Sequence, residues 1–143
     1  MSATVIDVFD IAMGLMDEIS STGASESADT AEYRTRTLRI INNLQQELYP
    51  LSDSYAVAAA GKRPVLARLA VLTDVIGLDD YLTQTVLPYG LAAALLLDEN
   101  PAVASFFQQR YEELKRLARS VPAAFSAIED VYGGIEHGQF SRW

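Results

Sequence analysis

The stretch LDDYLTQTVLPYGLAAALLLDENPAVASFFQQRYEELKRLA, residues 78–118, decides the fold. It predicts two helices, one over 78–97 and one from Pro101 to about Arg119, joined by the short acidic turn 98–100. The first helix is apolar on every side from Leu91 to Leu97, and such a helix lies in a core or in a subunit interface. The rest of the chain is therefore expected to pack around this pair.

The ends of the two helices carry the residue types that helix termini favour. Asp79 and Asp80 open the first helix, where carboxylates complement the positive end of the helix dipole. Asn100 is a good N-cap for the second helix. Pro101 follows at the first helical position, where its missing N–H costs nothing.

Proline and glycine interrupt the first helix of the pair. Pro88 removes a backbone hydrogen bond, and Gly90 follows two residues later, so we expect a kink over 85–88 or two abutting helices. The second helix is amphipathic, and its large apolar side chains are predicted to pack inward: Val103, Phe106, Phe107, Tyr111, Leu114 and Leu117.

Two further helices are predicted earlier in the chain, over 4–20 and over 31–48, with Pro50 stopping the latter. The first has the apolar face Val5, Val8, Phe9, Ala12, Leu15, Met16 and Ile19. The second has the apolar stripe Tyr33, Thr37, Ile40, Ile41, Leu44 and Leu48. Its polar side carries Arg34, Arg36, Arg39, Asn42, Asn43, Gln45 and Gln46. The small polar stretch 21–29 is predicted to be a loop, and Asp29 or Thr30 offers the next N-cap.

The segment 49–77 is predicted to be a long irregular connection. An alanine cluster, Gly61 and Pro64 favour a loop with short extended pieces, and 65–72 fits either a short strand or a helical turn. The adjacent Lys62 and Arg63 have two readings in so acidic a chain. One is a solvated loop, and the other is a contact point for an acidic partner.

The residues after the fourth helix differ in character from the helical part. We divide the chain into a helical bundle domain over 1–120 and an extended C-terminal tail over 121–143, which is part of the same domain or docks on a neighbour. Disordered tails are poor in large apolar and aromatic side chains, but this one contains Tyr132, Ile135, Phe140 and Trp143. We therefore expect the tail to dock on its own core or on another subunit.

Composition excludes several classes of protein. The chain has 143 residues and a net charge of −8, from 19 acids and 11 bases, which argues against a protein that grips nucleic acid. It has no cysteine, so thiol catalysis and zinc–thiolate sites are excluded. The N-terminal residues lack the basic region of a secretory signal, and the longest apolar run is too short to span a bilayer, so no membrane association is expected.

No residue pattern points to catalysis or to a cofactor. His137 is the only histidine and lies beside a glycine in the tail, which predicts a solvated residue. The carboxylate pairs are Asp79–Asp80, Asp98–Glu99 and Glu129–Asp130, and adjacent residues on a helix do not face each other. Phosphate-binding, dinucleotide-binding and calcium-loop motifs do not occur. We therefore predict no catalytic, cofactor-binding or metal-binding residues.

The expected fold is all-α, a bundle of about four main helices with the irregular connection 49–77 and the extended tail. Residues 78–114, LDDYLTQTVLPYGLAAALLLDENPAVASFFQQRYEEL, resemble a pattern found in the small head–tail connector (adaptor) proteins of tailed bacteriophages and prophages. The shared features are an acidic helix start, an apolar helix interrupted by proline and glycine, a short acidic turn, and a helix with aromatic and Glu-Glu residues. The order of elements over the whole chain is also similar.

That resemblance implies a structural, non-enzymatic protein without a cofactor. Such proteins form a homo-oligomeric ring beneath the portal in the virion neck, extend the DNA channel and receive the tail. DNA passes without being specifically bound, and an acidic wall suits that passage because it repels phosphates. Before assembly the subunits would be in the host cytoplasm. The candidate subunit and portal contacts are Lys62, Arg63, Tyr132, Ile135, Phe140 and Trp143.

Two other classes fit the residues alone. One is a cytoplasmic helical protein-interaction module unrelated to virions, which would have a defined partner and form no ring. The other is a small helical enzyme or ligand carrier with a pocket between the second and fourth helices. That class requires converging polar groups, which nothing in the sequence demands.

Overall fold

Helices make up the regular structure of the chain. The computed structural model describes residues 2–17, 30–55 and 61–120. They contain four α-helices: α1 (Val5–Leu15), α2 (Ala31–Leu48), α3 (Leu87–Leu96) and α4 (Pro101–Ser120). A 3-10 turn, η1 (Tyr49–Leu51), follows α2, and a π-helical segment, η2 (Leu82–Val86), precedes α3. The described residues form no strand, only an isolated bridge between Thr4 and Val75. The predicted all-α class is confirmed.

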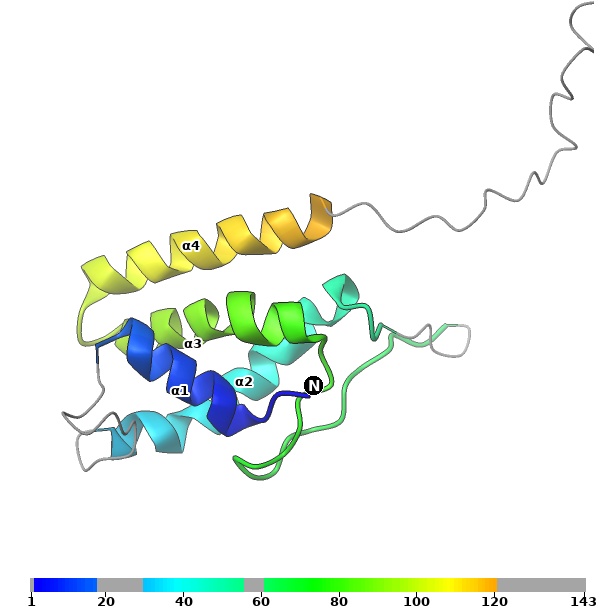
Figure 1. The fold of residues 1–143 in the computed structure, drawn as a ribbon, viewed down its shortest axis with the longest axis horizontal. Coiled ribbons are helices and arrows are strands. Elements are labelled where there is room, and N and C mark those ends of the chain that lie inside the picture. The colour runs from blue at the N-terminus through cyan, green and yellow to red at the C-terminus, as the bar shows by residue number, and fades with distance from the viewer. Residues whose placement is uncertain (1, 18–29, 56–60, 121–143) are drawn as a thin grey trace, which may run out of the picture.

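The central element is α3, which contacts α1, α2 and α4. In Figure 1 it lies between α4 on one side and α1 with α2 on the other. Leu87, Leu91 and Leu95 are completely buried in the core that these helices share. The apolar run is thus central, as predicted, except for its last residue. Leu97 lies in the turn that follows and is 63% exposed.

The interruption before α3 takes the form of a π-helix. Pro88 has no N–H, and its ring would crowd the carbonyl four residues earlier, so the preceding turn widens. The N–H of Leu87 accordingly donates to the carbonyl oxygen of Leu82, five residues back. Hydroxyl groups of Thr83 and Thr85 donate to backbone carbonyl oxygens one turn earlier. The expected break over 85–88 therefore starts earlier, at Leu82.

Helix α1 is shorter than the predicted span of 4–20. Thr4 and Asp7 form a reciprocal capping box at its start. Its end is set by Met16 as C-cap and by Asp17, whose φ of 60° is left-handed and stops the helix. The buried face is Val5, Val8, Phe9, Ala12 and Met13. The predicted helical residues 18–20 and the loop 21–29 lie outside the described residues.

Helix α2 has the predicted bounds, but the prediction that all of its polar residues face solvent is wrong for one of them. Gln45 was expected on the wet face and is completely buried. Its amide donates to Asn42 and to the carbonyl oxygen of Ala67, because the connection folds over this side of the helix. Thr30 is the N-cap residue, but its side chain makes no capping hydrogen bond.

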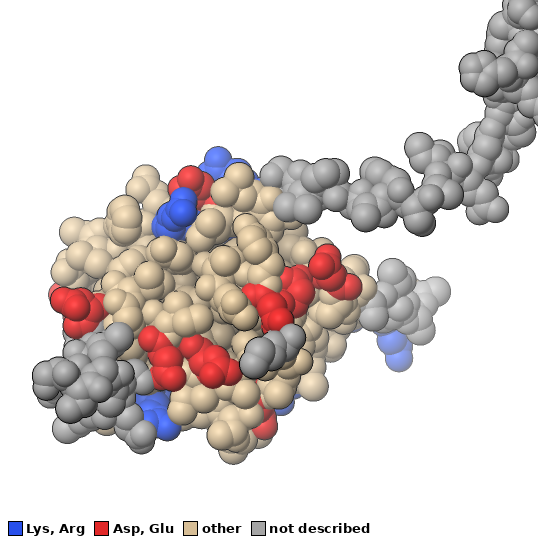
Figure 2. Space-filling model, in the orientation of Figure 1, with Lys and Arg blue, Asp and Glu red and all other residues tan. Residues whose placement is uncertain are grey.

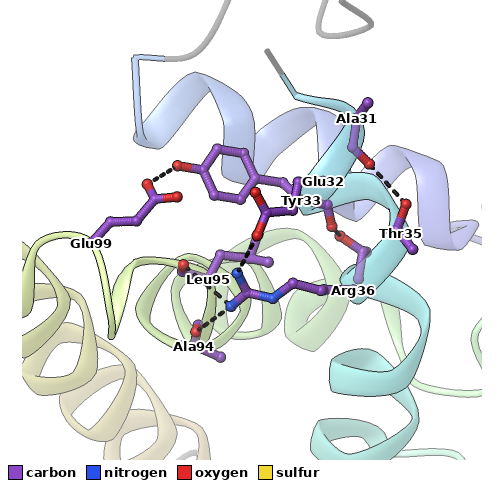
Figure 3. A network of polar contacts seen from close by, with 9 residues as sticks. Ala31, Glu32, Tyr33, Thr35, Arg36, Ala94, Leu95 and Glu99 are labelled. Atoms are coloured by element: carbon purple, nitrogen blue, oxygen red, sulfur yellow. Dashed lines mark hydrogen bonds and ion pairs between the residues drawn. The ribbon is translucent and has the colours of Figure 1, made fainter. Parts of the chain in front are cut away.

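The turn between α3 and α4 is fastened to the first half of α2 (Figure 3). Arg36 donates to the carbonyl oxygens of Ala94 and Leu95 at 3.4 Å each, where a cation complements the negative end of helix α3. The Tyr33 hydroxyl donates to the carboxylate of Glu99. The acidic turn therefore contributes structural contacts, and the Asn100 side chain caps α4 as predicted by accepting from the N–H of Val103 at 3.3 Å.

The described helices include none that is both long enough and apolar enough to cross a bilayer.

Candidate interaction surfaces

The connection after residue 61 is neither strand nor helix, although one of the two was expected over 65–72. Amide side chains of α2 supply its backbone partners instead. Asn42 accepts from the N–H of Leu69 at 2.8 Å and donates to its carbonyl oxygen at 2.9 Å. Gln46 makes the same pair of bonds with Leu66, at 3.0 and 2.9 Å. The helix therefore satisfies backbone groups of the connection, as a neighbouring strand would.

The end of the connection is fixed to α1. The N–H groups of Val5 and Ile6, which have no partner inside a helix, donate to the carbonyl oxygens of Asp74 and Leu72 at 3.1 and 2.9 Å. The Asp74 carboxylate accepts from the N–H groups of Val71 and Ala70 at 3.0 and 2.7 Å. These two backbone bonds hold the pKa of Asp74 below its ordinary value. The connection is therefore held by α2 at Leu66 and Leu69 and by α1 at Leu72 and Asp74.

A groove lies between α2 and the connection, with a volume of about 910 Å³. We call it the α2 groove. It is lined by Thr35, Leu38, Arg39, Asn42, Asn43 and Gln46 from α2 and by Arg68, Leu69 and Ala70 from the connection. Arg39 and Arg68 form no ion pair with any residue in the described part of the chain. Two arginine charges are thus available to a partner.

The structure places Lys62 and Arg63 on the same connection as Arg68, and both are exposed. Sequence reasoning had not selected Arg39 or Arg68 as candidate contacts. A signal was present in the distribution of charge: residues 34–68 contain six of the 11 bases but only two of the 19 acids. The sequence did not indicate that residues on a helix and on an irregular segment would share one groove.

A second surface runs along α4. The buried face of this helix is Ala104, Phe107, Tyr111 and Leu114. Three residues that were predicted to pack inward do not: Val103 is 36% exposed, Phe106 61% and Leu117 49%. The prediction was wrong because α4 packs on α3 alone over most of its length, and one helix covers only a narrow arc. We call Val103, Phe106 and Leu117 the α4 stripe.

Charged groups between α2 and α4 hold these helices together. Lys115 pairs with Glu47 of α2 at 2.6 Å and with Glu112 of its own helix at 3.2 Å. Burial by itself would lower the pKa of Lys115, but the hydrogen bonds to both carboxylates outweigh it and raise the pKa above its ordinary value. Burial also raises the pKa of the nearby Tyr111 hydroxyl, and the charge of Glu47 adds to that effect. Lys115 therefore links α4 to α2 through its ion pair with Glu47.

The candidate tail residues Tyr132, Ile135, Phe140 and Trp143, together with His137, lie outside the described residues. Within residues 2–17, 30–55 and 61–120, no three His, Cys, Asp or Glu side chains gather in a way that could hold a metal ion. No protein-family model, curated protein or solved structure matches the chain.

Proposed function

We propose that the chain is a structural head–tail connector of a phage or prophage, which forms a ring beneath the portal and receives the tail. The role is non-enzymatic and works through contacts with copies of itself and with portal and tail proteins. The proposal starts from the resemblance carried by residues 78–114. It places the assembled protein in the virion neck.

The observation that carries the proposal is the α4 stripe. Val103 and Phe106 lie one turn apart on one side of a twenty-residue helix, and Leu117 lies on the same side three turns later, beyond the exposed Arg110–Glu113 ion pair. Phe106 is the most exposed of the three, at 61%. Exposed large apolar side chains that share one side of a helix are typical of a surface that another protein covers. A subunit whose own core leaves such a stripe uncovered suits a protein that works by assembly.

The held connection supports the same proposal. It presents Arg68 at a fixed position, because α2 satisfies the backbone groups of Leu66 and Leu69 on either side of that residue. A surface that is already ordered loses less conformational entropy on binding than a mobile loop would. The net charge of −8 remains compatible with a channel wall past which DNA slides.

The genes on either side of this one give the first test. We expect portal, capsid and tail genes there. The second test is to produce the chain together with the portal protein encoded nearby and to examine the purified assembly by electron microscopy. A ring of this chain on the portal is the expected result. Neighbouring genes of metabolism or regulation, or a portal that emerges without this chain, would contradict the connector role.

A further inference from the structure

Charge is unevenly distributed over the molecule. Figure 2 shows acidic side chains gathered over the face on which α1 lies. Asp7 and Asp10 line a hollow beside Thr83 and Gln84 of η2. Asp53 and Asp79 line a second hollow beside Leu82, at the start of the same segment. We call Asp7, Asp10, Asp53 and Asp79 the acidic face.

The α2 groove and the acidic face are built on different elements, the groove on α2 with the connection and the acidic face on α1, η2 and their neighbours. Val5, Val8 and Phe9 turn the buried side of α1 inward and leave Asp7 and Asp10 outside. On α2 the buried residues are Tyr33, Thr37, Ile41, Gln45 and Leu48, and the groove is formed by the other side of the helix. One copy of the chain therefore presents a basic groove on the outer side of α2 and acidic side chains on the outer side of α1.

We propose that these two surfaces are the two halves of the contact between neighbouring subunits, with the α2 groove of one copy receiving the acidic face of the next. The inference deepens the proposed ring and rests on it. A ring is built from head-to-tail contacts, which require two different and complementary surfaces on each subunit. Opposite charge on the two surfaces supplies that complementarity and disfavours groove-to-groove and face-to-face pairing.

A second copy of the chain fits the groove better than a nucleic acid does. A polyanion would meet two groove arginines on a protein whose net charge is −8, which is a poor balance for phosphate binding. The acidic face of another copy is present at equal concentration wherever the protein is made. Exposed ion pairs contribute only about 0.2–1 kcal/mol each, so the charges chiefly set orientation while ring closure adds stability.

The absence of cysteine from the sequence allows a direct test with the full chain. One variant carries Asn43→Cys in the groove, and a second, labelled with ¹⁵N, carries Gln84→Cys beside the acidic face. The two are mixed at rising concentration and oxidised, and mass spectrometry counts the three possible disulfide-linked dimers. The proposal expects groove-to-face dimers to exceed clearly the half share of all dimers that random pairing would give them. A random 1:2:1 mixture, or an excess of groove-to-groove dimers, overturns it.

Charge-reversing substitutions on each surface test whether opposite charges direct the pairing. Arg68→Glu on the groove partner and Asp10→Lys on the face partner should each lower the yield of the groove-to-face dimer by about fivefold, the equivalent of about 1 kcal/mol. Both substitutions together, one on each partner, should restore much of it. The controls Arg116→Glu and Asp98→Lys change net charge equally and lie outside both surfaces, so they should leave the yield unchanged. If the control substitutions lowered the yield of the groove-to-face dimer as much as the test substitutions do, the proposal would be overturned.

The outcome separates this inference from the proposed function. If this chain forms rings on the portal but the groove-to-face dimer is not favoured, the ring uses another contact and only the inference fails. If no ring forms on the portal, the connector role fails, whatever the cross-links show.

Discussion

Gly90 is the position at which one added methyl group is expected to disturb the core most directly. A Cβ atom there would lie 2.8 Å from Cε2 and 2.9 Å from Cδ2 of the Tyr111 ring, and 3.1 Å from Leu44. That ring is completely buried, so it cannot move aside freely. Glycine at this point therefore permits the close approach of α3 and α4.

Gly90→Ala is expected to lower the free energy of unfolding by about 1–3 kcal/mol, the usual cost of overpacking, although alanine is the better helix former. Urea denaturation measures the change. Gly77→Ala is the matched control, because its Cβ would also lie at 2.8 Å, but from the end of the flexible Leu66 side chain. A Gly90→Ala protein as stable as the parent would show that the α3–α4 contact is looser than described.

The protonation of two carboxylates, Asp7 and Asp74, is expected to make the stability of the fold depend on pH. Hydrogen bonds from the Thr4 backbone and hydroxyl hold the pKa of Asp7 below its ordinary value of 3.8, and backbone bonds do the same for Asp74. A carboxyl whose pKa is lower in the folded state binds its proton more readily when unfolded. Its contribution to stability is therefore complete above the ordinary pKa and is lost as pH falls below it.

We expect unfolding free energy to decline as pH is lowered from about 5 to about 2, and Asp7→Asn and Asp74→Asn to flatten that decline. The effect is modest because both groups are solvent-screened. Chemical denaturation at a series of pH values measures it. Asp53→Asn is the control, since the Asp53 side chain is exposed and caps no helix. A decline of the same slope in all variants would exclude these two groups as its source.

At the scale of elements, the connection depends on the amides of α2. Asn42→Ala removes the hydrogen bonds of its side chain with Leu69, Gln45 and the Leu38 carbonyl. The N–H and carbonyl of the buried Leu69 are left without partners. We expect a loss of about 2 kcal/mol of stability and faster amide exchange over 66–70. Asn43 is the next residue along α2 and is exposed. Asn43→Ala should therefore change stability by less than about 0.5 kcal/mol. Equal effects from both substitutions would contradict the role given to Asn42.

Adjacent phenylalanines test the orientation of α4. Phe107 is 6% exposed, so Phe107→Ala should cost about 3–5 kcal/mol of stability. Phe106 belongs to the α4 stripe, so Phe106→Ser should cost less than about 1 kcal/mol while impairing ring assembly on the portal. Thermal unfolding and electron microscopy measure the two effects. If Phe106→Ser were the more destabilising substitution, Phe106 rather than Phe107 would be the residue that packs in the core.

At the scale of the whole molecule, the aromatic residues of the tail are predicted to be subunit contacts. Removing residues 133–143 is expected to leave the helical content and thermal unfolding of the chain unchanged while abolishing assembly. Circular dichroism measures the first effect, and the mass of the assembly measures the second. A truncated chain that assembles normally would show that the aromatic tail residues are not subunit contacts.

Local sequence determined the helices because the interactions that form them are local. The bounds Ala31–Leu48 and the start of α4 at Pro101 were predicted from apolar spacing, from a following proline and from the capping side chain of Asn100. Each of these acts within one or two helical turns. The all-α class follows from them, and so does the central position of the apolar run that becomes α3.

The tertiary structure alone decided which sides of those helices remain exposed and how the connection is held. Phe106 and Phe107 are consecutive residues of α4, and the sequence alone does not tell which of them faces the core. The position of α3 decides that Phe107 is buried and Phe106 exposed. The segment 65–72 has no regular structure, because its backbone partners are Asn42, Gln45 and Gln46 of a distant helix. The α2 groove arises from the same long-range contact. Local propensity cannot encode such pairings, since they depend on residues brought together only by the packed fold.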